Sequence, residues 1–440
     1  MTDLIGSTPL FELAATDTGT RLFLKLENMN PTGAAKIRMA RAMVDDAEAR
    51  GVLRPGGHII ESTSGNTGLG LAVIAAERGY RFTAVVDHHA CRDKLRTMKA
   101  MGAELVFASK DDDETLSTSA REELAEKLAR VECEAARSAG LEPNTYFTEQ
   151  HNNDANPLGY YALADELLAD LGRVDVLISA VGTGGSLFGT GRRLRDRGVE
   201  LLMYGVEPVG SIAFGGPAGP YWQSGTGTPE GADPGKTVDE DLSLLEDGVK
   251  VSDVEAFATA RVVAAKLGLM IGGSAGGSVF AALRRMDEFP AGSTVVTIIG
   301  DGGEKYLDTV FDDEWMSDRD LLDAETESAV AEMLDRYSPA RCATPESDEL
   351  SRGAETHTIL LASDGQPDTE PTTGTQAAEF AESSAITELP AANPSSLEAA
   401  ELSGITEYRT PIESSDVTDN FFEDHEFGTA TAVSAGAAGK

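Results

Sequence analysis

The sequence predicts an α/β protein with two domains, each built on a mostly parallel sheet flanked by helices. Short runs rich in β-branched residues alternate with helical stretches, which is the rhythm of βαβ units. The rhythm stops at a long, charged, amphipathic segment, 117–139, and resumes after it. Beyond Tyr337 the composition changes and the β-branched runs become few. We therefore predict two α/β bodies followed by a tail.

The predicted elements follow one another in the order that a parallel sheet requires. In the first half of the chain we predict helices over 37–49, 68–78 and 93–101, with strands at 58–60, 82–86 and 104–107. In the second half we predict strands at 174–179, 201–207 and 294–299 and a helix at 187–195. Strands that alternate with helices indicate crossover connections and parallel pairing.

Charge and composition indicate a soluble enzyme with an acidic surface. The 440 residues include 74 acidic and 36 basic residues, which gives a net charge of −38. Residues 339–440 hold 19 acidic and 4 basic residues, so a net charge of −23 remains on the first 338. Because the folded part is itself acidic, we predict a halophilic protein, whose dense charge is screened by salt. Nucleic acid and anionic membranes would be repelled, and we predict neither as a partner.

Other segments exclude several classes of protein. No apolar run reaches transmembrane length and the N-terminus lacks a signal pattern, so we predict a cytoplasmic protein. The cysteines Cys91, Cys133 and Cys342 are widely spaced, and we predict no disulfide framework and no metal site. Residues 338–440 are rich in Ala, Ser, Thr and Glu and cannot bury enough apolar surface to fold, so we predict a disordered, low-complexity acidic tail.

Four turn or glycine-rich segments could carry the chemistry. They are 30–36 (NPTGAAK), 63–68 (TSGNTG), 182–186 (GTGGS) and 272–277 (GGSAGG). Lys36 follows a turn and heads a predicted helix, where its amine can meet a cofactor aldehyde. The segment 182–186 lies between a strand and a helix, the geometry that holds a phosphate on backbone N–H groups. Each segment alone has a plainer interpretation, such as a surface lysine, a helix cap or a tight turn, but four in this order form a constellation.

With these segments the sequence resembles the pyridoxal-phosphate enzymes of the cysteine synthase and cystathionine β-synthase family, also called fold type II. The resemblance runs from about residue 5 to about residue 315 and includes 25–27 (KLE), 94–106 and 303–307 (GEKYL). It implies a small cofactor and substrate domain, 36–143, and a large domain formed by 1–35 and 144–320. It also implies a homodimer that binds a small amino-acid substrate.

The resemblance implies a role for each candidate site residue. Lys36 would form the Schiff base with pyridoxal 5'-phosphate, Asn66 would bond the ring hydroxyl oxygen, and Ser274 would bond the pyridine nitrogen. The phosphate would lie on Gly182, Thr183, Gly184, Gly185 and Ser186. The substrate carboxylate would lie on Thr63, Ser64, Thr67 and Gln150. A serine in place of a carboxylate at the pyridine nitrogen favours β-replacement over transamination.

The implied reaction is β-replacement on an O-activated L-serine, either O-acetylserine or O-phosphoserine. With sulfide the product is cysteine, and a cysteine synthase is the function we predict. The alternatives are a cystathionine β-synthase or diaminopropionate-precursor synthase with an amino-acid nucleophile, a serine or threonine dehydratase, and a non-catalytic regulatory relative. Residues 61–64 and 305–308 resemble the siderophore-pathway enzyme that joins O-phosphoserine to glutamate. Departures from the family pattern at Ile37 and at 300–302 leave the substrate open.

Overall fold

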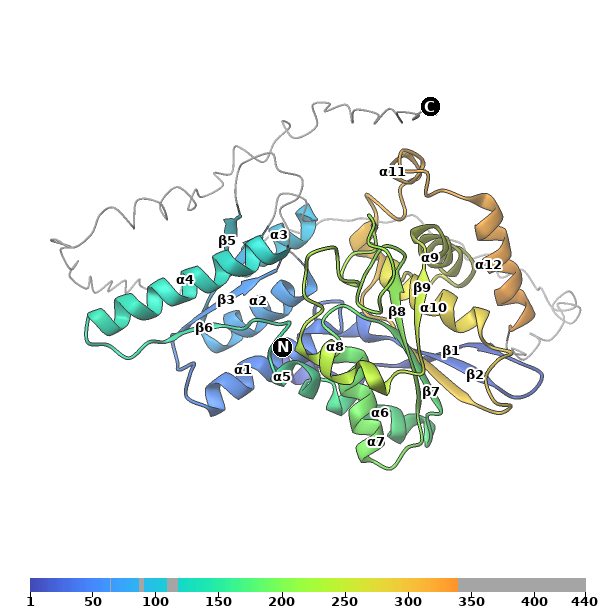
Figure 1. The fold of residues 1–440 in the computed structure, drawn as a ribbon, viewed down its shortest axis with the longest axis horizontal. Helices are drawn as coiled ribbons and strands as arrows, with labels where there is room; N and C mark the ends of the chain where they lie inside the picture. Colours follow the sequence, from blue (N-terminus) through green and yellow to red (C-terminus); the bar gives the residue numbers. More distant parts are fainter. Residues whose placement is uncertain (64, 87–90, 109–117, 339–440) are drawn as a thin grey trace, which may run out of the picture. The chain divides into compact units, whose positions relative to one another are not determined.

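The computed structural model describes residues 1–338 except 64, 87–90 and 109–117. These residues form one six-stranded and one four-stranded sheet with helices around them (Figure 1). The predicted α/β class with parallel sheets flanked by helices is thereby confirmed. The predicted tail lies outside the described residues except for Ser338, and the domain boundaries stay a prediction.

The larger sheet has the strand order β1-β2-β10-β7-β8-β9. Its strands are β1 (Leu10–Ala15), β2 (Arg21–Lys25), β7 (Val176–Ala180), β8 (Leu202–Pro208), β9 (Asp247–Val251) and β10 (Thr294–Ile298). All neighbouring strands pair in parallel except β1 and β2, which form an antiparallel hairpin. The three strands predicted for this region are β7, β8 and β10, whereas β1, β2 and β9 were not predicted.

Both faces of the larger sheet are buried, because side chains alternate between two apolar cores. Along β2, Leu22 and Leu24 pack with helices α9 (Asp253–Leu267), α10 (Gly273–Arg284) and α12 (Ala324–Arg336). Phe23 points to the opposite face and packs with α6 (Tyr161–Leu171) and α7 (Thr190–Asp196). Covering on both faces is typical of parallel sheets.

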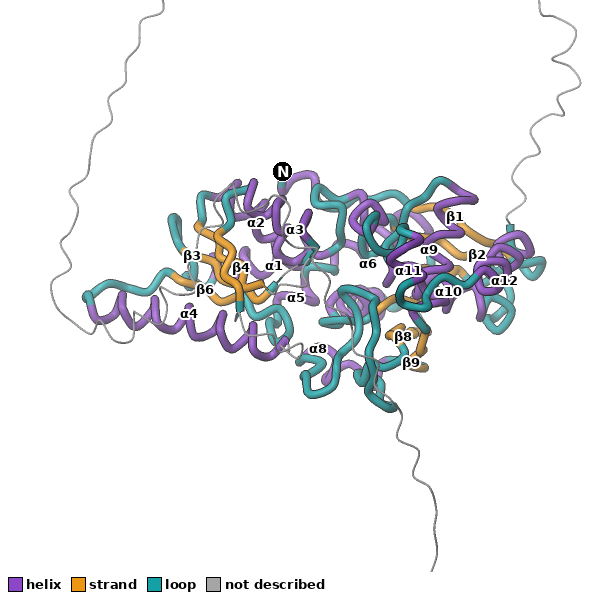
Figure 2. The backbone as a smooth tube through the Cα atoms, turned by 90° about the horizontal axis from the view of Figure 1, so that it is seen from above, coloured by secondary structure: helices purple, strands orange, loops and turns teal. Residues whose placement is uncertain are grey.

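The smaller sheet has the strand order β5-β4-β3-β6 and is parallel throughout. Its strands are β3 (His58–Ser62), β4 (Arg81–Val86), β5 (Glu104–Phe107) and β6 (Thr145–Phe147). Figure 2 shows α4 (Thr118–Ser138) along one side of this sheet, and α2 (Asn66–Arg78) and α3 (Arg92–Ala100) on the other. The amphipathic segment predicted at 117–139 is thus a helix that covers the smaller sheet.

Helix α1 (Lys36–Ala49) belongs to both halves of this body. Met39 and Met43, one turn apart, pack in the core that lies under the larger sheet. Ala40, Val44 and Ala47 pack in the core of the smaller sheet. The first residue of this shared helix is Lys36, so the predicted reactive lysine lies where the two cores meet.

The predicted bounds of two helices, 68–78 and 187–195, differ from those in the structure. The helix predicted at 68–78 is α2, which begins earlier, at Asn66. The predicted helix 187–195 is two pieces, a π-helical turn η3 (Gly185–Gly189) followed by α7. At Gly189 a Cβ would lie 2.1 Å from the carbonyl oxygen of Pro157, so glycine permits the close approach of a neighbouring helix.

The remaining described helices are short. They are η1 (Thr2–Leu4), η2 (Glu27–Met29), α5 (Ala155–Leu158), α8 (Lys236–Asp241), η4 (Leu242–Leu244), η5 (Gly303–Tyr306) and α11 (Asp313–Ser317). Within the described ranges, no helix combines the length and the apolar character needed to cross a membrane.

Candidate active site

Lys36 is held by a turn that a second segment of the chain fixes in place. Gly33 takes a left-handed conformation, with φ +64°, which glycine adopts without strain. The backbone N–H of Ala35 donates to the carbonyl of Gly300 at 2.9 Å. The amine of Lys305 donates to the carbonyls of Thr32 (2.9 Å) and Gly33 (2.8 Å). The conformation just before Lys36 therefore depends on residues 300–305, which follow β10.

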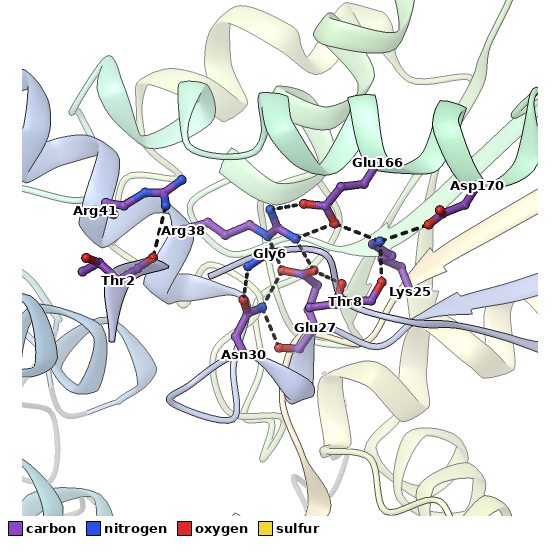
Figure 3. A network of polar contacts seen from close by, with 10 residues as sticks. All are labelled: Thr2, Gly6, Thr8, Lys25, Glu27, Asn30, Arg38, Arg41, Glu166 and Asp170. Atoms are coloured by element: carbon purple, nitrogen blue, oxygen red, sulfur yellow. Dashed lines mark hydrogen bonds and ion pairs between the residues drawn. The ribbon is translucent and has the colours of Figure 1, made fainter. Parts of the chain in front are cut away.

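A buried ionic network anchors the same turn from the other side (Figure 3). The guanidinium of Arg38, 1% exposed, donates to both oxygens of Glu27 at 2.6 and 2.8 Å. It also donates to both oxygens of Glu166 at 2.8 and 2.9 Å. Asn30, which begins the turn, donates its amide to the Glu27 carboxylate at 2.9 Å. Burial opposes ionisation of Glu166, but hydrogen bonds from Arg38 and Lys25 hold its pKa at about 2.

One cavity gathers most of the predicted site residues. Lys36 comes from α1, Asn66 from the start of α2, and Ser274 from the start of α10. The predicted phosphate loop contributes Gly182, Thr183, Gly184 and Ser186, and Gly185 lies within the same loop. Ser224, Gly225, Gly300 and Asp301 complete this part of the wall. The loops that follow β7 and β10 both reach the cavity, so it lies at the carboxyl edge of parallel strands, the usual place for a ligand.

The glycine loop after β7 is shaped for an anion. Gly184 has φ +82°, and a Cβ at Gly185 would lie 1.9 Å from Oδ1 of Asn156. The backbone N–H groups of Gly182, Thr183 and Gly184 have no acceptor among the described residues. Asn156 donates to Oγ1 of Thr183 at 3.0 Å and so steadies the loop. Free N–H groups ahead of a helical turn suit a phosphate.

The electrostatics of Lys36 suit a reactive amine. The partly buried side chain lines the cavity, and loss of hydration lowers the pKa of its amine. The negative charges of Asp301 and Glu61 oppose this shift. A lysine with a lowered pKa carries a larger fraction of neutral, nucleophilic amine. Together with the anion loop, it fits an aldehyde that bears a phosphate.

Two of the residues predicted to bind the substrate carboxylate, Thr67 and Gln150, are hydrogen-bonded to each other, and a third, Thr63, bonds the backbone at the start of α2. Oγ1 of Thr67 donates to Oε1 of Gln150 at 2.7 Å. The Gln150 amide donates to Oε1 of Glu61 at 3.2 Å. Oγ1 of Thr63 accepts from the N–H of Gly68 at 3.1 Å, near the start of α2. None of these three predicted residues is among the cavity residues named above, and Ser64 lies outside the described residues.

Sequence reasoning missed two carboxylates near the site. Glu61, 1% exposed, accepts from Thr148 and Gln150, and its burial raises its pKa to about 7 although these bonds oppose the shift. Asp301 lines the cavity and accepts from Asn66 at 2.8 Å. Asp301 could have been found from its position, since a polar residue in the loop that follows a parallel strand lies at the ligand edge of the sheet. Glu61 lies within a strand and gives no such signal.

In this α/β fold the cavity places a partly buried lysine beside a glycine loop of the kind that suits an anion. The family model described as "Pyridoxal-phosphate dependent enzyme" matches residues 1–301. The chain therefore belongs to the family of pyridoxal-phosphate-dependent enzymes, whose cofactor is pyridoxal 5'-phosphate. The residues of the cavity fit this cofactor, because they offer an amine for its aldehyde and free N–H groups for its phosphate.

Named relatives come from the same family. The chain is 46% identical to the "Putative cysteine synthase" of Sinorhizobium fredii, over 77% of this chain and 96% of that protein. It is 35% identical to the "Probable cysteine synthase" of Bacillus subtilis, over 70% of this chain and 95% of that protein. Its structure resembles that of the O-acetylserine dependent cystathionine β-synthase from Helicobacter pylori, with a TM-score of 0.62 and 30% identity. That match covers 70% of this chain and 96% of the other.

Proposed function

We propose that the protein catalyses β-replacement on an O-activated L-serine, O-acetylserine or O-phosphoserine, and acts as a cysteine synthase with sulfide as nucleophile. The observation that supports this most is the gathering of Lys36, Asn66, Ser274 and the loop 182–186 around one cavity. The names of the two cysteine synthase relatives support the same substrate class.

Lys36 would have two tasks in this reaction. Its amine, whose pKa is lowered by burial, would hold the cofactor through the cofactor's aldehyde, and once free it would act as the general base that removes the substrate's α-proton. The cofactor, when bound, withdraws electrons from the α-carbon and so eases the loss of that proton. The loop 182–186 would hold the cofactor phosphate, and Asn66 would orient the ring through its hydroxyl oxygen.

Ser274 would set the type of reaction. It lines the cavity at the first turn of α10, where its hydroxyl would meet the pyridine nitrogen. A hydroxyl carries no negative charge and does not favour protonation of that nitrogen. The cofactor would then withdraw electrons less strongly, which favours loss and replacement of the β-substituent over transamination.

An amino-acid nucleophile is the second candidate. Residues 61–64 and 305–308 resemble the enzyme that joins O-phosphoserine to glutamate. The Helicobacter relative is an O-acetylserine dependent cystathionine β-synthase. Homocysteine or an amino-acid amine would then take the place of sulfide, with the same first half-reaction at Lys36.

The test is a product assay with matched lysine variants. The purified holoenzyme, in high salt, is given O-acetylserine or O-phosphoserine with sulfide, homocysteine or glutamate, and products are identified by mass. Borohydride reduction should attach the cofactor to the peptide that carries Lys36. We expect Lys36→Ala to lose this attachment and at least about a hundredfold in turnover. Lys266→Ala, at a surface lysine paired with Asp335, should keep both. A fully active Lys36→Ala variant, or keto acid as the sole product, would refute the proposal.

The setting of the enzyme belongs to the same proposal. We infer a homodimer from the family resemblance, and we infer a cytoplasm of high salt because the net charge of the first 338 residues is −23. We also propose that residues 338–440 are dispensable for chemistry, since the family match ends at residue 301. Stability that rises with molar salt supports the first inference, and a truncated active enzyme supports the second.

A further inference from the structure

Asp301 lies where two parts of the cavity wall are joined. Its backbone forms an isolated antiparallel bridge with Ala34, two residues before Lys36. Its carbonyl accepts from the N–H of Gly272 at 3.1 Å, at the start of α10. The segment 300–302 thus links the turn that carries Lys36 to the helix that carries Ser274. The side chain at position 301 is therefore positioned by backbone contacts with both the turn and the helix.

The Asp301 carboxylate is buried and partly satisfied. It is 2% exposed, and its Oδ2 accepts from the amide of Asn66 at 2.8 Å and from the hydroxyl of Tyr306 at 2.6 Å. Its Oδ1 has no hydrogen-bond partner among the described residues. A Cβ at position 272 would lie 2.1 Å from this Oδ1, so Gly272 leaves room for the carboxylate. A buried acceptor without a donor is costly and marks a place where a ligand can contribute.

Asn66 is fixed at both ends of its amide. Its Nδ2 donates to Asp301, while its Oδ1 accepts from Lys305 at 2.9 Å. A carboxylate accepts only and an ammonium donates only, so these two partners permit a single orientation of the amide. Nδ2 carries two N–H groups, and Asp301 takes one of them. The second N–H remains for the cavity that Asn66 lines.

Among the described residues, the charge around Lys36 comes from few groups. Asp301 and Glu61 are the negative groups that act on the amine, and His151 is near enough for the Lys36 charge to contribute to lowering the His151 pKa to about 4, mainly through burial. Burial and Asp301 raise the pKa of Tyr306 well above its ordinary value, so its hydroxyl stays protonated and donates. Beyond Tyr306 the charged or titratable neighbours are Lys94, Lys305, Glu304 and Cys91.

We propose that Asp301 is a positioning residue for the cofactor, which holds the Asn66 amide with one N–H free for the ring hydroxyl oxygen and places a negative charge beside the Lys36 nitrogen. The inference rests on the proposed function, because it assumes that the cofactor lies between Lys36 and Asn66. It adds that the two properties of position 301 have separate effects. The charge acts on the protonation of the Lys36 nitrogen, and the hydrogen bond to Asn66 acts on cofactor binding. Asparagine can keep the hydrogen bond and remove the charge, whereas serine removes the charge and is too short to keep the bond.

The test is a pH titration of the visible absorbance of the holoenzyme, from about pH 6 to about pH 10, where His151 stays neutral. The band reports the proton on the Lys36 nitrogen when that nitrogen is joined to the cofactor. Asp301→Asn and Asp301→Ser should both move the midpoint down by about one pH unit, because an adjacent negative charge stabilises the protonated form. Asp301→Ser should in addition weaken cofactor binding to the apoenzyme about fivefold, while Asp301→Asn should change it less than about twofold.

Matched variants separate this inference from its alternatives. Asp241→Asn removes a buried carboxylate that pairs with Arg192 away from the named cavity residues, and its midpoint should equal that of the wild type. Glu61→Gln measures the share of the shift that the other carboxylate contributes. If borohydride does not fix the cofactor to Lys36 in the wild type, the proposed function fails. If it does, and both Asp301 variants titrate as the wild type does, the role of Asp301 is overturned. Asp301→Ser provides a second, smaller side chain should Asp301→Asn fail to fold.

Discussion

Glu27 and Glu61 are almost equally buried, at 0% and 1% exposure, yet they belong to opposite kinds of environment. Glu27 follows a strand of the larger sheet and accepts two hydrogen bonds from the guanidinium of Arg38. Glu61 lies in β3 of the smaller sheet and accepts from the neutral groups of Thr148 and Gln150. One carboxylate has a cation within hydrogen-bond distance, and the other has neutral donors.

The difference teaches how the two regions serve the same cavity. A guanidinium that donates to both oxygens of a carboxylate fixes the orientation of the carboxylate, and removal of one partner leaves the charge of the other uncompensated, so such a pair fixes geometry. A buried carboxylate with neutral donors can exchange its proton near neutral pH, as the pKa of about 7 for Glu61 indicates. We infer that the larger sheet holds Lys36 rigidly and that the smaller sheet supplies a titratable neighbour.

The largest effect is expected from breaking the ion pair. Arg38→Met leaves Glu27 and Glu166 without their guanidinium, and we expect a loss of about 3–5 kcal/mol in the free energy of unfolding, measured with urea. Arg41→Met, on the same helix and with a single long contact among the described residues, to the Thr2 carbonyl at 3.4 Å, should lose less than about 0.5 kcal/mol. Equal losses in the two variants would show that the network does not anchor the turn.

A smaller effect should come from Glu61→Gln and should depend on pH. The folded protein raises the pKa of Glu61 from 4.5 to about 7, so the folded state binds this proton more tightly than the unfolded chain. The resulting stabilisation is fully present below about pH 4.5 and is lost as the pH rises to about 7. Between these values the wild type should lose up to about 3 kcal/mol relative to the variant, measured by urea unfolding across the pH range. Parallel pH profiles would contradict the contrast with Glu27.

The smallest effect concerns the hydrogen bond that steadies the Glu61 cluster. Thr67→Val keeps the shape of the side chain but removes the donor to Gln150, which leaves a buried amide oxygen unpaired. We expect a loss of about 1–2 kcal/mol in thermal or urea unfolding. Thr259→Val, which removes a bond to a carbonyl within helix α9, is the matched control and should cost less than about 0.5 kcal/mol. A control that loses as much as Thr67→Val would show that Gln150 needs no such donor.

The sequence predicted the strands whose composition is strongly apolar. β4, β7 and β8 are buried runs between helices, and their apolar composition can be recognised from neighbouring residues alone. The hairpin of β1 and β2 was missed because its residues gain strand geometry from pairing with each other and with β10, which lies about 270 residues away. β6 has three residues, too few to show any periodicity.

The site was predicted as far as its parts are local. The turn before Lys36 and the loop 182–186 are each contiguous, so the glycines and the lysine reveal them. The contact of Asn66 with Asp301 spans 235 residues, and the bond of Lys305 to Asn66 spans 239. A single sequence does not reveal that residues so far apart are in contact, because they come close only when the two sheets are in place.

Helix α1 contributes residues to the cores of both sheets. Seven of its 14 residues are buried, and five of these are divided between two cores. A helix that completes both cores cannot leave one without opening the other, so the halves of the body share one cooperative unit. Damage to the smaller sheet, far from any reacting atom, is thereby transmitted to the residue that begins this helix, and evolution can change either core only as far as the lysine remains in place.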